Sequence, residues 1–242
     1  MKRCTYLTRA LPFALAASIF PGSALCAPGD GIAGTHHDFS GTGDPGAGLC
    51  TYCHTPHKAV TQDLLWSHTL STNTFSWSVS QTAGGTPYPT FRGDTYRGST
   101  AKCLGCHDGS VAIGDLVWWN GGPPAPLDVR RISGGARMGP DGNMGSNHPV
   151  AMPYPFQNVK GAYNGVTTGA GFRAGEWVAD PTTRGIRLYN DDGAKDIRNG
   201  PVVGRSGIEC GSCHDPHNGP DVQDGRFLRG TAGGICDKCH VK

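Results

Sequence analysis

A five-residue pattern, C-x-x-C-H, occurs four times in this chain of 242 residues and restricts its fold more than any other feature. In each copy two thiols lie within one turn of chain, where they can add to the two vinyl groups of a haem. The histidine that follows can then bind the haem iron as its proximal ligand. The pattern therefore predicts four covalently bound haem c groups. The attachment cysteines are Cys50, Cys53, Cys103, Cys106, Cys210, Cys213, Cys236 and Cys239, and the proximal histidines are His54, His107, His214 and His240.

The histidine that ends every copy separates haem attachment from other uses of paired cysteines. Zinc sites, redox dithiols and disulfides also use C-x-x-C pairs, but none of them requires this histidine. Histidine is 10 of 242 residues, so its chance occurrence after all four pairs has odds of roughly one in 300,000. Haem attachment is therefore favoured over the zinc, dithiol and disulfide alternatives.

The composition leaves little material for an ordinary protein core. Glycine (38) and proline (18) are abundant, and only 37% of the residues are hydrophobic. We therefore expect a mostly irregular, coil-rich multihaem cytochrome with short α-helices at the haem motifs, a minor β-hairpin and the haems as its core. The hairpin is expected from strands at 185–189 and 202–210, joined near the turn signal Asn190-Asp191-Asp192-Gly193.

Residues 1–26 have the pattern of a secretory signal peptide. Three basic residues precede an apolar run at 11–20, and small residues follow, with cleavage expected between Ala24 and Ala27. A membrane anchor is the weaker alternative because the run is too short to span a bilayer. Lipidation at Cys26 is disfavoured by the bulky Leu25 before it. Residues 27–242 are then one exported tetrahaem cytochrome c domain, in the periplasm or outside the cell.

The charge balance argues against a nucleic-acid partner. Removal of residues 1–26 takes away three of the 21 basic residues and none of the 19 acidic ones, which leaves a formal charge of −1. A nucleic-acid-binding domain would be basic, with lysine and arginine gathered in a patch.

The remaining histidines are more than enough to bind the second face of each iron. Methionine ligation by Met138, Met144 or Met152 is the weaker alternative, because most methionines only pack. Four irons with two histidines each would have no open position for a substrate, and low reduction potentials are expected. The six candidates are His36, His37, His57, His68, His148 and His217.

Two of these histidines lie three residues after a proximal one, namely His57 after His54 and His217 after His214. Residues three apart on a turn project from nearly the same face, whereas two axial ligands approach an iron from opposite sides. His57 and His217 are therefore expected to reach neighbouring haems, which would bring two haems into near contact.

Taken together, these residues resemble the multihaem cytochromes with doubled C-x-x-C-H motifs. More narrowly, the chain is similar to the tetrahaem subunits of extracellular cytochrome filaments (nanowires) of the outer-surface cytochrome E type. Besides the four motifs, the similar segments are His37-Asp38-Phe39-Ser40, Thr55-Pro56-His57, Leu65-Trp66-Ser67-His68, Asp108-Gly109, Asn147-His148-Pro149-Val150, Asp215-Pro216-His217 and Phe227-Leu228-Arg229.

The resemblance implies a set of distal iron ligands and a mode of assembly. It implies His37, His57, His148 and His217 as distal ligands, and leaves His36 and His68 as secondary candidates. An N-terminal arm whose histidine binds a neighbour's haem would join subunits head to tail into a conductive filament. An arm that folds back on its own haem would instead give a monomeric electron carrier, and both arrangements stay open.

The function expected first is electron transfer along a haem chain, with other cytochromes or extracellular electron acceptors as partners. The alternative is a small multihaem reductase with one open haem site. A zinc-binding structural protein is the third possibility.

Overall fold

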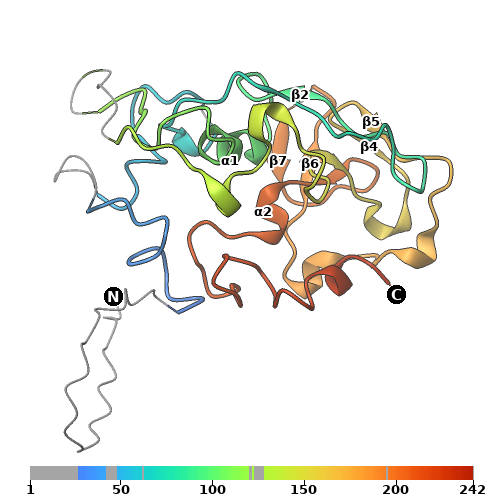
Figure 1. The fold of residues 1–242 in the computed structure, drawn as a ribbon. Coiled ribbons are helices and arrows are strands. Elements are labelled where there is room, and N and C mark those ends of the chain that lie inside the picture. The colour runs from blue at the N-terminus through green and yellow to red at the C-terminus, as the bar shows by residue number, and fades with distance from the viewer. Residues whose placement is uncertain are drawn as a thin grey trace, which may run out of the picture.

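The computed structural model describes residues 27–41, 48–61, 63–119, 122, 128–194 and 196–241 (Figure 1). The predicted signal peptide, with Cys4 and Cys26, lies outside these residues. The helices are α1 (Ser99–His107) and α2 (Cys210–Cys213), and the strands are β1 (Thr74–Phe75), β2 (Phe91–Arg92), β3 (Met152–Pro153), β4 (Ala162–Tyr163), β5 (Val166–Thr167), β6 (Tyr189–Asp191), β7 (Ile197–Asn199) and β8 (Ser206–Ile208). The 3₁₀ helices are η1 (Asp63–Leu65), η2 (Gly134–Ala136), η3 (Pro140–Gly142), η4 (Phe156–Asn158), η5 (Ala174–Glu176), η6 (Pro181–Arg184) and η7 (Cys236–Lys238).

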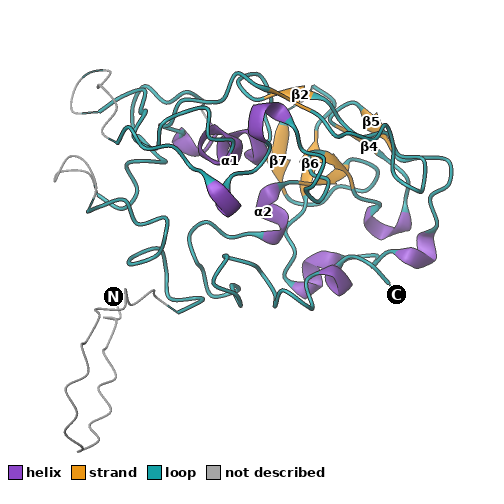
Figure 2. Cartoon of the chain, in the orientation of Figure 1, coloured by secondary structure: helices purple, strands orange, loops and turns teal. Residues whose placement is uncertain are grey.

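The strands form three antiparallel sheets (Figure 2). The largest has four strands in the order β3-β8-β6-β7, and the other two are the pairs β1-β2 and β4-β5. Asn164 and Gly165 join β4 to β5 with φ angles of 51° and 73°. Positive φ at both central residues is typical of the tight hairpin turn that Asn-Gly favours.

The predicted hairpin at 185–210 is present with different boundaries. The expected turn residues Asn190 and Asp191 belong to β6, which pairs with both β7 and β8. Their side chains are satisfied within the sheet, because Asn190 donates to the Gly200 carbonyl at 2.8 Å and Asp191 accepts from the backbone of Asn164 at 2.8 Å. Local turn preference was therefore overridden by strand pairing and side-chain hydrogen bonds.

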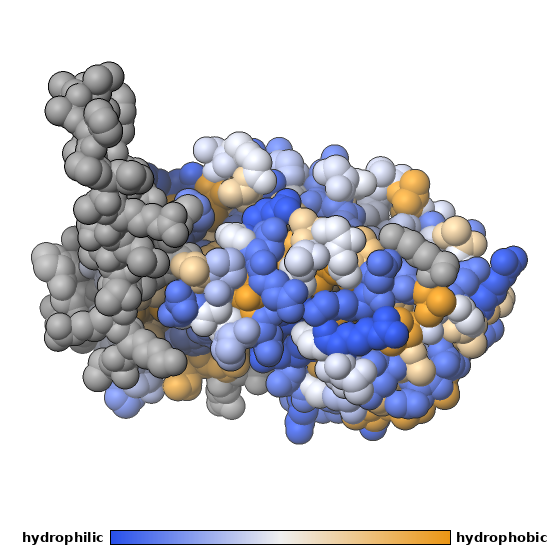
Figure 3. All heavy atoms as spheres, turned by 90° about the horizontal axis from the view of Figure 1, so that it is seen from below, coloured by the Kyte–Doolittle hydropathy of each residue, from blue (hydrophilic) through white to orange (hydrophobic). Residues whose placement is uncertain are grey.

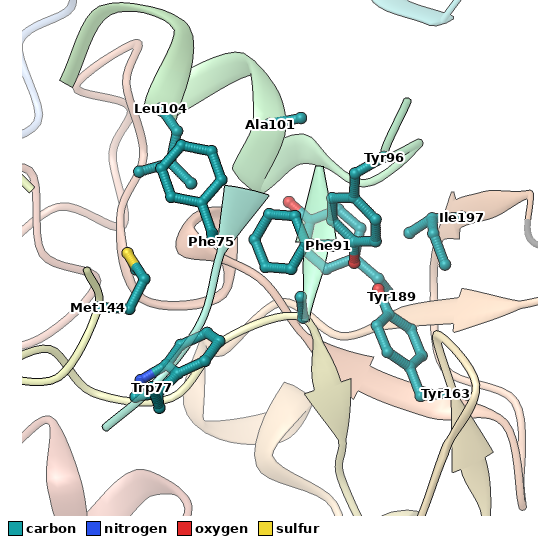
Figure 4. Close-up of a cluster of buried hydrophobic side chains, with 11 residues drawn as sticks. Phe75, Trp77, Phe91, Tyr96, Ala101, Leu104, Met144, Tyr163, Tyr189 and Ile197 are labelled. Atoms are coloured by element: carbon teal, nitrogen blue, oxygen red, sulfur yellow. The ribbon is translucent and has the colours of Figure 1, made fainter. Parts of the chain in front are cut away.

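The largest core is a cluster of protein side chains that joins α1 to the sheets (Figure 4). The Phe75 and Phe91 ring centres are 5.5 Å apart, and those of Phe91 and Tyr96 are 4.5 Å apart. Smaller clusters lie around Tyr52, near the first C-x-x-C-H motif, and around Tyr154, near the fourth. The members of the main cluster are Phe75, Trp77, Phe91, Tyr96, Ala101, Leu104, Met144, Ala151, Tyr163, Tyr189 and Ile197.

The fold expected from composition, a coil-rich chain with haems as its core, is wrong. The described residues form two α-helices and eight strands in antiparallel sheets around aromatic side-chain clusters. Among those residues no group of three or more His, Cys, Asp or Glu side chains could hold a metal ion. The composition misled because a few large aromatic residues, each of which can bury 150–250 Å², build the core despite the low hydrophobic fraction.

The surface is mixed in character. The face in Figure 3 carries hydrophilic and apolar residues interspersed. The most exposed large apolar side chains include Leu64 at 60% and Val129 at 76%. Over the described ranges, no helix has both the length and the apolar character needed to cross a membrane.

Candidate haem sites

Three pairs of imidazole rings face one another, and each pair joins a histidine of a C-x-x-C-H motif to one of the six other histidines. The sequence separation within each pair is large, so the fold rather than local chain geometry creates them. The pairs are His54–His217 with ring centres 6.2 Å apart, His37–His107 at 6.1 Å and His148–His240 at 6.4 Å.

These separations suit two ligands on opposite faces of one iron. An imidazole nitrogen binds a metal at about 2 Å, and the ring centre lies about 1 Å beyond that nitrogen. Two imidazoles on one iron therefore have ring centres about 6 Å apart. Each of the three observed separations leaves room for an iron between the rings.

The hydrogen bonds of these histidines leave the iron-binding nitrogen available. In four of them, and also in His214, Nδ1 faces a backbone carbonyl, which can only accept, so Nδ1 carries the hydrogen and the lone pair is on Nε2. Metal-binding histidines are oriented in this way in proteins. The Nδ1-to-oxygen distances are 2.5 Å for His54 to Leu64, 2.8 Å for His107 to Ala136, 2.8 Å for His214 to Arg226, 3.2 Å for His37 to Pro216 and 2.9 Å for His148 to Pro149.

His217 is oriented by a carboxylate instead. Its Nδ1 lies 3.4 Å from Asp215 Oδ1, two residues earlier in the chain. The residues present at these sites therefore fit the two axial positions of a haem iron, and the fit rests on the tautomer as well as on ring spacing.

The N-terminal arm that carries His37 packs against its own chain. His37 stacks on Phe227 with ring centres 4.8 Å apart. The buried Asn218 accepts from the Gly29 backbone at 3.0 Å and donates to the carbonyls of Ala27 and Gly31. Burial lowers the pKa of His37 to about 4, so the ring is neutral at pH 7.

Two of the expected iron ligands are not paired with another histidine ring among the described residues. Within the described residues, neither the proximal histidine His214 nor the expected distal ligand His57 faces another histidine ring at such a distance. His57 is exposed, as is His36. In the described part of the chain, the third motif therefore has its histidine, His214, without a second histidine ring opposite it.

His68, a secondary candidate, is buried beside the second motif, with its Nε2 at 3.3 Å from Cys106 Sγ. It is 1% exposed, and its Nδ1 and Nε2 lie 2.7 Å from the Thr69 carbonyl and 2.8 Å from the Ala112 carbonyl. Both ring nitrogens are thus engaged with the backbone. Of the methionine candidates, Met144 is buried in the aromatic core, whereas Met138 is 39% exposed.

The eight motif cysteines are all free. Burial raises the pKa of Cys53 to about 11 and that of Cys239 to about 12. A redox-active dithiol has the opposite property, a thiol pKa below its ordinary value. A zinc site needs four clustered ligands, and the described residues hold no group of even three.

Neighbouring motifs lie near one another in the order of the sequence. Burial and the nearby Cys53 raise the pKa of Cys106, which links the first motif to the second. A side-chain hydrogen bond between the Cys210 and Cys103 thiols is the main cause that raises the pKa of Cys210, so the second and third motifs lie side by side. Cys236 contributes, after burial and Cys210, to the raised pKa of Cys213. Figure 1 shows α1 and α2 between residues 48–61 at one end and the C-terminus at the other.

The sequence missed the groups that orient the histidines. Backbone carbonyls of Leu64, Ala136 and Arg226 hold three proximal rings, and every residue has such a carbonyl, so no sequence signal marks them. The sequence also missed Glu209, a buried carboxylate directly before the third motif. Its position beside Cys210 was the signal that could have drawn attention to it.

Comparison with known proteins adds nothing to these observations. No protein-family model matches the chain, and no curated protein matches it. The functional argument therefore rests on the residues and their geometry.

Proposed function

We propose that this chain is a tetrahaem c-type cytochrome that carries electrons in periplasmic or extracellular electron transfer. The observation that carries the proposal is the set of three facing imidazole pairs, each containing a C-x-x-C-H histidine, with ring centres 6.1–6.4 Å apart. A haem iron takes its other ligands from the porphyrin, so two protein ligands per site are enough. A cluster of three or more protein ligands is not required.

The residues that would hold each haem have separate roles. Paired cysteines of a motif would form the two thioether bonds, and the following histidine would bind the iron. The hydrogen bond at histidine Nδ1 fixes the ring orientation and makes Nε2 a better ligand. When bound, haem supplies one-electron redox chemistry.

The order of the motifs supports conduction across the molecule. Cys53 acts electrostatically on Cys106, Cys103 on Cys210, and Cys236 on Cys213, so the four motifs follow one another as neighbours in one series. A carrier that receives electrons at one end and delivers them at the other needs such continuity. Its partners would be other cytochromes or extracellular electron acceptors.

The third motif favours a second candidate, assembly of several copies. His214 has no distal partner among the described residues, while His57 is exposed and unused there. A His57 from another copy could complete the His214 site, and a head-to-tail contact of this kind repeats into a filament. His37 of the arm is less suited to that role, because it already lies beside His107.

The remaining candidate is a reductase in which the iron at His214 keeps an open position for a substrate. The spin state of the purified oxidised protein, measured across a range of concentrations, separates the two. Assembly predicts a high-spin haem that becomes low-spin as copies associate, and His57→Ala abolishes both the association and the change. The reductase predicts a high-spin haem at every concentration, which binds added small ligands and is unaffected by His57→Ala.

The proposal itself is tested by replacing a distal histidine. His217→Ala is expected to convert one haem to high spin with the full haem content retained, because His54 loses its facing ring. The matched control His36→Ala, in an exposed histidine of the arm, should leave the spectrum unchanged. A His217→Ala spectrum identical to that of the parent protein would contradict the proposed ligand pair.

A further inference from the structure

We infer that Glu209 is a positioning residue that fixes the second and third haem motifs to each other, and that its buried negative charge lowers the reduction potentials there. The inference rests on the proposed function. Glu209 directly precedes Cys210, is 1% exposed, and is one of only two glutamates in the chain. Nothing in the haem-site geometry described above uses it.

The carboxylate of Glu209 joins three elements. Its Oε1 accepts from the Tyr96 hydroxyl and, at 2.7 Å, from the Tyr163 hydroxyl. Its Oε2 accepts at 3.0 Å from the backbone of Thr100, in the first turn of α1. A negative charge at that end of a helix is stabilised by the helix dipole and by the unsatisfied backbone donors.

Glu209 also begins α2, the helix of the third motif. It forms a reciprocal capping box with Ser212, whose hydroxyl accepts from the Glu209 backbone at 3.0 Å. The Cys210 backbone in turn donates to Thr100 Oγ1 at 3.1 Å. One side chain thus caps the two helices that carry Cys103 and Cys210.

The surrounding glycines leave space for this arrangement. A Cβ at Gly98 would lie 2.6 Å from Glu209 Oε1, and one at Gly207 would lie 2.3 Å from the Tyr163 ring. Neither distance is possible for a real side chain. The close packing excludes water from the carboxylate, and a charge without water acts strongly on its neighbours.

The charge of Glu209 is not neutralised by a basic side chain within the described residues. The titratable groups beside it are Tyr96, Tyr163, Tyr189 and Cys210, from the segments before and after it. Cys210 would lose its titration in a thioether bond, and burial raises the pKa of each tyrosine. Glu209 is therefore the only carboxylic acid of this set and the group whose charge is expected to change first as the pH rises.

Burial raises the pKa of Glu209 above its ordinary value of 4.5. The folded protein therefore binds this proton more tightly than the unfolded chain does. The Glu209 contribution to stability is fully present below pH 4.5 and is lost as the pH rises through the raised pKa. Over the same range the new charge lowers the potentials of nearby haems.

The test compares Glu209→Gln with Glu176→Gln, which changes the only other glutamate. Glu176 is 59% exposed in an ion pair with Arg173, so its charge is screened by water. Haem content is first measured by intact mass, and each holoprotein is then titrated with a reductant at several pH values. A parent protein without haem would contradict the proposed function. Unchanged haem reduction potentials in a Glu209→Gln protein that carries all four haems would contradict this inference alone.

The expected result is that Glu209→Gln raises two of the four midpoint potentials and removes their pH dependence above pH 4.5. The change is of order tenfold in the ratio of oxidised to reduced haem, about 59 mV for one electron. Glu176→Gln should leave all four potentials unchanged. Thermal unfolding gives an independent readout, because the fall in stability with rising pH should be smaller in Glu209→Gln than in the parent.

Tyr163→Phe keeps the inference testable if Glu209→Gln does not fold. It retains the carboxylate but removes one hydroxyl donor, so the pKa of Glu209 should rise further. The pH-dependent step in the two potentials is then expected to move to higher pH. A step that stays where it is in the parent protein would contradict the role of Glu209.

Discussion

The second and third haem motifs are built differently from the first and the fourth. The central two lie on α1 and α2, which meet through a hydrogen bond between Cys103 and Cys210. The first motif, Cys50–His54, lies in turns, and its His54 pairs with Trp66 in a single antiparallel β-bridge. The fourth lies on the 3₁₀ helix η7.

This difference shows that C-x-x-C-H does not specify one local secondary structure. The same spacing occurs in an α-helix, a 3₁₀ helix and a set of turns, and tertiary packing decides between them. The central motifs are supported by the aromatic cluster and by Glu209. The terminal motifs have fewer such contacts, so they should depend more on the attached haem for their order.

The largest expected effect comes from removing the cysteines of one motif. Both Cys50→Ala/Cys53→Ala and Cys103→Ala/Cys106→Ala should lose one of four haems by intact mass. Amide hydrogen exchange then compares the order of the two regions. Residues 48–61 are expected to lose protection in the first variant, whereas α1 should stay protected in the second. Equal loss in the two regions would remove the distinction between central and terminal motifs.

The next effect concerns the core that supports the centre. Phe75 is 0% exposed, and its replacement by alanine should lower the free energy of unfolding by about 3–5 kcal/mol. Leu64→Ala, in a side chain that is 60% exposed, should change it by less than about 0.5 kcal/mol. Chemical denaturation of both variants, each with its haems attached, measures the two changes in the free energy of unfolding. Similar small losses would show that haem contacts, not the aromatic cluster, dominate stability.

A smaller effect is expected where the N-terminal arm is attached. Asn218→Ala removes the buried hydrogen bonds to Gly29, Ala27 and Gly31, at a cost of about 1–3 kcal/mol. The arm should then detach and withdraw His37 from His107, so part of one haem becomes high-spin. The exposed Asn199 offers a control in Asn199→Ala, which should leave the spectrum unaltered. An Asn218→Ala protein with only low-spin haem would show that His37 is held by other contacts.

The sequence predicts attachment sites because thioether chemistry requires residues that are close along the chain. It could not indicate which histidines face one another, since His54 and His217 are brought together by the fold alone. The aromatic core was missed for the same reason: Phe75 and Tyr189 belong to different sheets, and no local pattern joins them. Composition suggested too little apolar material, but it does not report where that material is concentrated.

The central claim, that four haems are covalently attached to eight cysteines, is tested most directly by mass and metal analysis of the exported protein. The account predicts a red protein whose intact mass exceeds that of its polypeptide by four haems and that contains four irons per chain. A colourless protein with the mass of its amino acids alone would contradict the account.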